Sequence, residues 1–99
     1  MEIVDKKVVV TGAASGIGKA LAIEFKNEKA KDVILADLNE EVLAVAEELG
    51  FSGFVVNVGK EEEVKDLIAF ANEKMGGVDI FCSNAGTVSY THLTLPTNC

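Results

Sequence analysis

Four short apolar segments alternate along the chain with three longer amphipathic ones, and this alternation limits the possible folds more than any other feature. The apolar segments are rich in β-branched residues, as buried strands of a parallel sheet are. They are Lys7–Thr11, Asp32–Asp37, Phe54–Val58 and Asp79–Asn84. Strands that alternate with helices form βαβ units with right-handed crossovers. The sequence therefore predicts an α/β fold with a parallel sheet, in the order β-α-β-α-β-α-β.

The three amphipathic segments carry an apolar residue every three or four positions, which is the period of an α-helix. The predicted helices run from Gly16 to about Glu28, from the capping residue Asn39 to Leu49, and from Lys60 to Met75. In the first helix, the stripe expected to face the sheet is Ile17, Ala20, Leu21 and Phe25. A glycine follows each of the other two helices directly, as a helix C-cap often requires.

Composition and charge exclude several classes of protein. With 48% hydrophobic and 25% charged residues, the chain has the make-up of a soluble globular domain. No apolar run approaches the ~20 residues that cross a bilayer, and the acidic N-terminus is unlike a signal peptide, so we expect a cytoplasmic protein with no membrane partner. The net charge of −7 argues against nucleic acid, which needs clustered Lys and Arg. The two cysteines do not have the spacing of a zinc site, so no metal site is predicted.

The strongest chemical signal is the segment Thr11-Gly12-Ala13-Ala14-Ser15-Gly16-Ile17-Gly18, between the first predicted strand and the first predicted helix. Glycines allow a tight turn there, and they let backbone N–H groups approach a diphosphate at the positive end of the helix. A P-loop is excluded because no Gly-Lys-Ser/Thr sequence follows. The alternative is a tight turn that binds nothing. The position of the glycines after a buried strand favours a dinucleotide.

An acidic residue at the end of the second predicted strand agrees with this interpretation. Asp37 lies 19 residues after Gly18, close to the ~20 at which an acid meets the adenosine ribose. A carboxylate there would repel a 2′-phosphate, and no Lys or Arg occupies position 13, 14, 15 or 38. The sequence therefore favours NAD over NADP. The alternative for Asp37 is an exposed residue that caps the next helix.

Two motifs resemble those of the short-chain dehydrogenase/reductase family. The glycine segment has the family's spacing Thr-Gly-x-x-x-Gly-x-Gly, and Ser83-Asn84-Ala85-Gly86 resembles the Asn-Asn-Ala-Gly that closes its fourth strand. The resemblance covers residues 1–86 and implies a doubly wound parallel sheet of Rossmann type, truncated here after the fourth strand. It also implies that residues 1–86 are the N-terminal, NAD-binding part of such a domain.

The resemblance implies a set of cofactor contacts. Gly12, Ser15, Gly16, Ile17 and Gly18 would line the diphosphate and adenosine, and Asp37 would bind the ribose with Leu38 beside the adenine. Asn57 and Val58 match an Asp-Val pair that contacts the adenine, and Asn84, Ala85 and Gly86 would border the nicotinamide-side ribose. Asn57 departs from the family's Asp, and its alternative is a residue that caps a local turn.

Residues 87–99 do not continue the pattern. The string Val-Ser-Tyr-Thr-His-Leu-Thr-Leu-Pro-Thr resembles a reading frame through a transposase-type sequencing adapter, so we expect a non-native tail there. A natural divergent tail is the alternative, and the nucleotide sequence across the codons for Gly86 and Thr87 distinguishes the two. Without a fifth unit, the fourth strand is expected to be an open apolar edge.

In the family, hydride passes between the nicotinamide and an alcohol or carbonyl substrate. A tyrosine acts as acid–base, with a lysine four residues later and a serine beside the substrate. The only tyrosine here, Tyr90, is followed four residues later by Thr94, so no catalytic residue is assigned. We expect an NAD-dependent oxidoreductase parent, a homo-oligomer as is usual in the family, and an inactive 99-residue chain. The alternative is a non-catalytic, dinucleotide-sensing or regulatory protein on the same half-domain.

Overall fold

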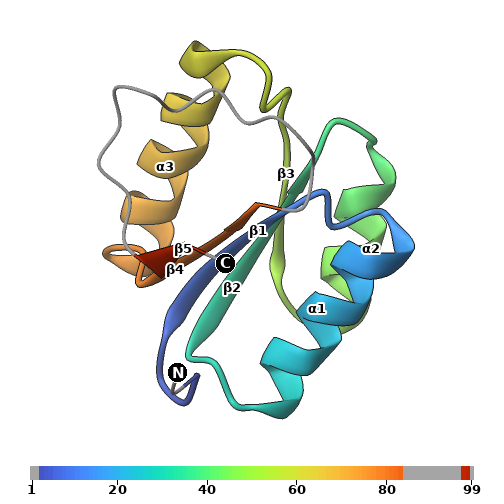
Figure 1. Cartoon of the computed structure of the whole chain (residues 1–99), viewed down its shortest axis with the longest axis vertical. Coiled ribbons are helices and arrows are strands. Elements are labelled where there is room, and N and C mark those ends of the chain that lie inside the picture. The colour runs from blue at the N-terminus through green and yellow to red at the C-terminus, as the bar shows by residue number, and fades with distance from the viewer. Residues whose placement is uncertain (1–2, 84–96, 99) are drawn as a thin grey trace.

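The computed structural model describes residues 3–83 and 97–98, which form one parallel sheet with helices on both faces (Figure 1). The strands are β1 (Lys7–Thr11), β2 (Asp32–Asp37), β3 (Ser52–Val55), β4 (Ile80–Ser83) and the two-residue β5 (Thr97–Asn98). The helices are α1 (Gly16–Asn27), α2 (Glu41–Leu49) and α3 (Glu61–Met75). The sheet order is β3-β2-β1-β4-β5, and every pair is parallel. The predicted doubly wound α/β fold is confirmed.

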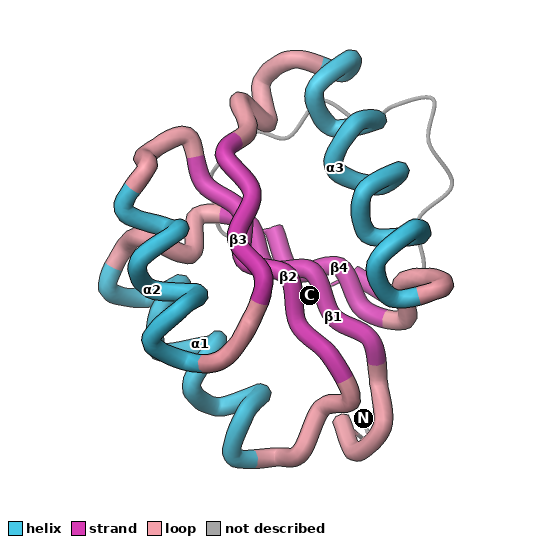
Figure 2. Tube along the Cα trace, turned by 180° about the vertical axis from the view of Figure 1, so that it is seen from behind, coloured by secondary structure: helices cyan, strands magenta, loops and turns pink. Residues whose placement is uncertain are grey.

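The sheet separates two apolar layers, because alternate residues of each strand point to opposite faces. Figure 2 shows α1 and α2 on one face and α3 on the other. In β1, Val8 and Val10 belong to the layer under α1 and α2, whereas Val9 belongs to the layer under α3. All three are fully buried. Burial of a valine side chain is worth about 1.5–3 kcal/mol, so this strand anchors both layers.

The third strand begins and ends earlier than the sequence predicted. Phe54–Val58 was expected, but β3 is Ser52–Val55. Pairing ends because β2 ends: Asp37 is opposite Val55 in the register, and the carbonyl of Asp37 accepts one further bond from the Val56 N–H at 2.9 Å. Val56 and Val58 are still buried, but in the turn that leads to α3.

The expected open edge at β4 is also corrected. β5 pairs with the first half of β4, with Ile80 opposite Thr97 and Phe81 opposite Asn98. The outer side of a strand presents unpaired N–H and C=O groups, which pair with any extended segment that reaches them. The sheet therefore has a short fifth strand, formed by residues of the segment that the sequence left outside the fold.

The buried stripe of α1 differs from the predicted one. The buried residues are Gly18, Ala22 and Phe25, whereas Ile17 is 71% exposed and Ala20 is also exposed. At Gly18 the backbone of the preceding turn lies directly against the helix. The predicted stripe shares Phe25 with the observed one but missed the small buried residues Gly18 and Ala22.

The C-terminal end of α2 agrees with the sequence, whereas its N-cap position is Glu40, one residue after the expected Asn39, and Glu40 makes no side-chain cap bond. The side-chain oxygen of Asn39 accepts a hydrogen bond from the Glu41 N–H at 2.9 Å, which satisfies one of the free donors at the helix start. At the other end Gly50 has a φ of 78°, a left-handed conformation that suits glycine.

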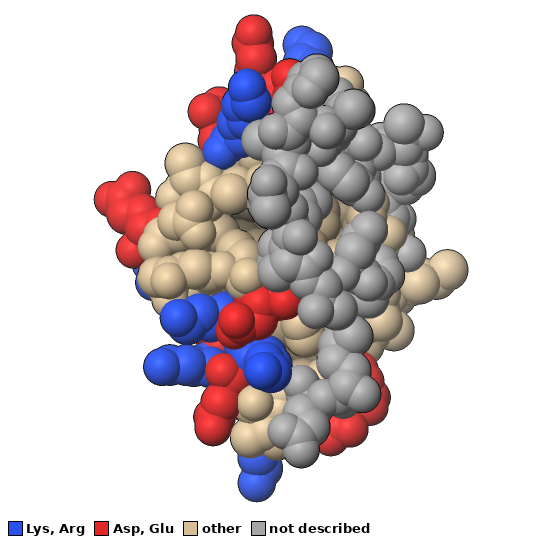
Figure 3. Space-filling view, turned by 60° about the vertical axis from the view of Figure 1, so that its left-hand side comes forward, with Lys and Arg blue, Asp and Glu red and all other residues tan. Residues whose placement is uncertain are grey.

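Charged side chains of both signs are mixed on the described surface. On the face drawn in Figure 3, basic side chains lie next to acidic ones. One pair joins two helices, with Lys19 of α1 lying 3.6 Å from Glu48 of α2. Among the described residues, no helix has the length and apolar character needed to pass through a lipid bilayer.

Candidate functional site

Those predicted site residues that the structure describes lie where the carboxyl ends of the strands meet at one edge of the sheet. Thr11, the last residue of β1, is opposite Ala36 of β2 and Ser83 of β4. The strand order also reverses here, because β2 and β3 lie on one side of β1 and β4 lies on the other. Open α/β sheets bind ligands outside the strand ends at such a point.

The turn from β1 to α1 is built on the carbonyl of Gly12. This residue has a φ of 68°, which favours glycine. Its carbonyl oxygen accepts hydrogen bonds from the Ser15 N–H at 3.2 Å and from the Ser15 hydroxyl at 2.7 Å. Ser15 is also the N-cap of α1, since its side-chain oxygen accepts from the Gly18 N–H at 3.3 Å. One serine thus fixes both the turn and the start of the helix.

Two glycines of the helix start have opposite surroundings. A Cβ at Gly18 would lie 2.0 Å from the carbonyl oxygen of Gly12, so the fold itself requires glycine there. A Cβ at Gly16 would have no atom within 4 Å. Packing in the described residues therefore does not explain Gly16, because a side chain there would enter open space at the first residue of α1.

The first turn of α1 offers backbone donors to that space. The N–H groups of Gly16 and Ile17 have no hydrogen-bond partner among residues 3–83 and 97–98. Free N–H groups and the helix dipole together give the N-terminus of a helix a partial positive charge. The arrangement fits the diphosphate of a dinucleotide.

The carboxylate of Asp37 lies beside this turn and is half-buried. Its Oδ2 accepts a hydrogen bond from the Ala14 N–H, and its Oδ1 accepts one from the Asn39 N–H, each at 2.9 Å. The alternative prediction, an exposed helix cap, describes only the second of these bonds. The first joins β2 to the glycine turn, and nothing in the sequence spacing indicated it.

Two apolar side chains of the predicted site are open to solvent. Ile17, next to Gly16, is 71% exposed, and Leu38, next to Asp37, is 66% exposed. They are the two most exposed large apolar residues of the described chain. Exposure of this degree leaves both side chains available to contact a ligand.

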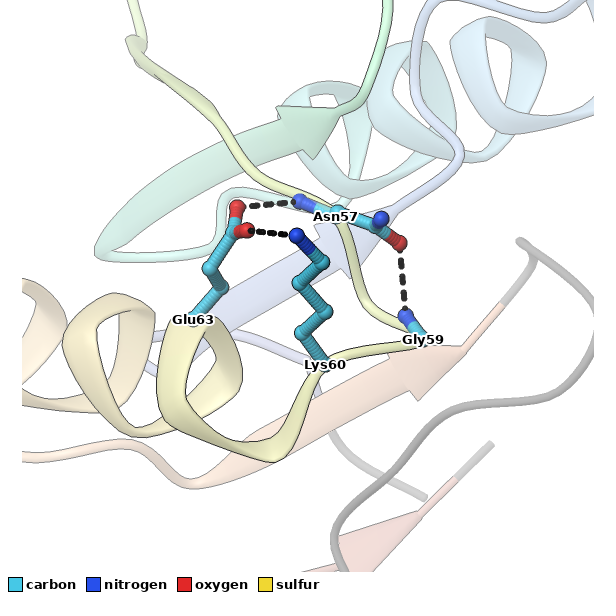
Figure 4. Close-up of polar contacts among 4 residues, drawn as sticks. All are labelled: Asn57, Gly59, Lys60 and Glu63. Carbon is cyan, nitrogen blue, oxygen red and sulfur yellow. Dashed lines mark hydrogen bonds and ion pairs between the residues drawn. The ribbon is translucent and has the colours of Figure 1, made fainter.

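The structure gives Asn57 a local role (Figure 4). Its side-chain oxygen accepts from the Gly59 N–H, and its own N–H donates to Oε1 of Glu63, both at 2.9 Å. Lys60 lies 4.0 Å from the other oxygen of Glu63. These contacts match the turn-capping alternative for Asn57. The cap uses only the side-chain oxygen, so the side-chain NH₂ of Asn57 can still donate to a ligand. Val58 is 8% exposed and contributes to the core.

Sequence reasoning missed Glu63 as part of this turn. α3 has no side-chain cap on Lys60, and the carboxylate of Glu63 in its first turn reaches back to Asn57 instead. A Glu at the third helical position often accepts a hydrogen bond from a backbone N–H that precedes the helix, but that N–H usually belongs to the N-cap residue itself.

The predicted residues Asn84, Ala85 and Gly86 lie outside the described part of the chain.

Comparison with known proteins gives consistent results. A family model described as short chain dehydrogenase matches residues 6–97, which extends past Gly86 into the segment expected to be non-native. An uncharacterized oxidoreductase of Staphylococcus aureus is 43% identical over an alignment of 94 residues, and the match covers 91% of this chain and 40% of that protein. The chain therefore spans less than half of the length of this relative.

Solved structures agree in fold. A short chain dehydrogenase from Mycobacterium smegmatis superposes with a TM-score of 0.81 at 32% identity, over 87% of this chain and 39% of that one. A 3-ketoacyl-(acyl-carrier-protein) reductase from Brucella melitensis, complexed with NADH, superposes with a TM-score of 0.76 at 31% identity, over 81% and 34% of the two chains.

Proposed function

The chain belongs to the short-chain dehydrogenase family, and we propose that it is the NAD-binding part of a longer oxidoreductase. The whole enzyme would transfer hydride between NAD and a small alcohol or carbonyl substrate. NAD supplies the hydride chemistry when it is bound. The role of this chain's own residues is to hold and orient the dinucleotide.

The observation that carries the proposal is the open space at Gly16, the first residue of α1. Two free N–H groups face no partner in the described chain, no side chain of residue 16 blocks the approach, and the carboxylate of Asp37 lies at the neighbouring strand end. These features suit the diphosphate and the adenosine ribose of one dinucleotide.

The proposed contacts follow the chain from the turn outward. Gly12, Ser15, Gly16, Ile17 and Gly18 would surround the diphosphate, and Asp37 and Leu38 would meet the ribose and adenine. Asn57 and Val58 would lie near the adenine, with Asn57 acting through its NH₂ because its oxygen accepts from Gly59. Asn84, Ala85 and Gly86 would border the ribose on the nicotinamide side.

The charge of Asp37 supports NAD over NADP. Its two oxygens each accept one backbone N–H group, from Ala14 and from Asn39, at 2.9 Å. An ionised carboxylate repels a 2′-phosphate, and positions 13, 14, 15 and 38 carry no Lys or Arg to compensate. The NADH in the Brucella melitensis relative is consistent with this choice.

We also propose that the 99-residue chain alone does not oxidise alcohols, because Tyr90 lacks a lysine four residues later. The complete enzyme would be a homo-oligomer. A non-catalytic dinucleotide-sensing or regulatory protein on the same half-domain is the second candidate. A coding sequence that continues to Tyr-x-x-x-Lys supports the enzyme, and one without it supports the sensor.

Calorimetric titration of the chain with NAD and with NADP tests the cofactor proposal. NAD is expected to bind more tightly, and Gly16→Ala is expected to weaken NAD binding without loss of secondary structure. The Lys19→Ala variant is the matched control, because it changes a neighbouring residue of α1 whose charged group pairs with Glu48. Equal affinity of the unaltered chain for the two dinucleotides would contradict the proposal.

A further inference from the structure

The glycine turn is attached to β2 by two hydrogen bonds at adjacent residues. The Ala13 N–H donates to the backbone carbonyl of Ala36 at 3.2 Å, and the Ala14 N–H donates to Oδ2 of Asp37 at 2.9 Å. The first bond needs no particular side chain. The second depends entirely on the carboxylate at position 37.

We propose that Asp37 is a positioning residue for the diphosphate-binding turn, in addition to being the partner of the ribose; this rests on the proposed function. Ala14 directly precedes Ser15, whose hydroxyl holds the Gly12 carbonyl and accepts from Gly18. A bond to an ionised acceptor is shorter and stronger than one between neutral groups. Asp37 therefore sets the place of Ser15, and through it the direction of the free N–H groups at the helix start.

The two roles of Asp37 are compatible at the same time. An ionised carboxylate has about four acceptor positions on its two oxygens. The N–H groups of Ala14 and Asn39 use one position on each oxygen. One position on each oxygen is left for the ribose hydroxyls, and the side chain is only half-buried. A substitution at Asp37 thus alters the turn as well as the ribose contact. Such a substitution alone therefore does not switch the preference from NAD to NADP without also weakening diphosphate binding.

A dinucleotide that lacks both hydroxyls on the adenosine ribose separates the two roles. If Asp37 positions the turn, Asp37→Ala weakens binding of this analogue by about tenfold, the effect of losing one hydrogen bond to a charged group. If Asp37 acts through the ribose alone, Asp37→Ala leaves this affinity unchanged, or raises it by removing a negative charge near the diphosphate. That second result would overturn the proposal.

Asp32→Ala is the matched control. Asp32 lies at the opposite end of β2, is also half-buried, and its Oδ1 accepts from a neighbouring backbone N–H at 2.9 Å. The variant removes the same charge from the same strand without touching the turn. It is expected to bind both the analogue and NAD as the unaltered chain does.

Hydrogen exchange of the Ala14 amide in the cofactor-free chain tests the same contact without a dinucleotide. Asp37→Ala is expected to speed this exchange about tenfold or more, and Asp32→Ala is expected to leave it unchanged. Should Asp37→Ala fail to fold, Asp37→Asn serves as the second variant. It retains one acceptor oxygen in place of two, so hydrogen exchange is expected to rise at the amide of Ala14 or of Asn39.

Unchanged exchange at both amides overturns the positioning role even if NAD binds. Faster exchange together with no NAD binding by the unaltered chain rejects the proposed function and keeps the positioning role.

Discussion

Replacement of Gly18 by alanine tests the packing that fixes the start of α1. The new Cβ would lie 2.0 Å from the Gly12 carbonyl oxygen, 2.7 Å from the carbon of that carbonyl and 2.8 Å from the Cα of Ala13. All three are backbone atoms of the turn, so no flexible side chain can move aside. The turn and the helix would have to separate by roughly 1 Å or more to restore ordinary contact.

The size of the effect follows from two opposing terms. Overpacking of a well-packed site costs about 1–3 kcal/mol. Alanine is a better helix former than glycine by about 1 kcal/mol, which opposes this cost. Because the three contacts are very short and involve only backbone atoms, we take the upper end of the overpacking cost. We therefore expect the free energy of unfolding to fall by about 2 kcal/mol. In a domain of this size, that loss lowers the melting temperature by roughly 10 °C.

The assay is urea and thermal unfolding followed by circular dichroism, with Gly16→Ala as the control. Gly16 lies in the same turn of the same helix, and an added Cβ there meets no atom within 4 Å. The control should therefore match the unaltered chain or exceed it in stability by up to about 1 kcal/mol. A Gly18→Ala variant as stable as the Gly16→Ala variant would refute the reasoning.

Three further outcomes are expected, each measured by urea unfolding. Gly50→Ala should lose about 1 kcal/mol because its φ of 78° is left-handed; no loss would mean that α2 ends differently. Glu63→Ala should lose about 1 kcal/mol because the Asn57 N–H loses its acceptor, whereas Glu63→Gln should keep most of the stability; equal losses would contradict this role. Lys19→Ala should change stability by no more than about 0.5 kcal/mol, since its partner Glu48 has a side chain that is 66% exposed; a larger loss would mean a stronger pair than its exposure allows.

The central strands were predictable from the sequence. β1 and β2 have the bounds that were expected, because each is a run of apolar residues buried on both faces of the sheet. β3 was predicted to begin two residues too late and to end three residues too late. The apolar residues Val56 and Val58 resemble a strand, but the length of an edge strand depends on where its partner ends, and sequence periodicity does not contain that information.

The place of the glycine turn and of Asp37 in the fold was predictable, but the contacts between them were not. The spacing of the glycines and Asp37 placed them at one edge of the sheet, as the structure has them. The bond from Ala14 to Asp37 was not predictable, because it is made by a backbone N–H group and depends on the exact path of the turn. Asn57 shows the opposite case, since the turn-capping alternative weighed for it from the sequence is the contact that the structure shows.

The contact between Gly18 and the Gly12 carbonyl also bears on motion. The backbones of Gly12 and Gly18 lie so close that a single Cβ does not fit between them. The side chain of Ser15 also bonds to both residues. We therefore expect the helix start and the turn to move as one unit. Accommodation of different ligands must then come from elsewhere. The freedom lies in the solvent-facing side chains of Ile17 and Leu38, which can change rotamer on the nanosecond scale while the amide scaffold beneath them keeps its shape.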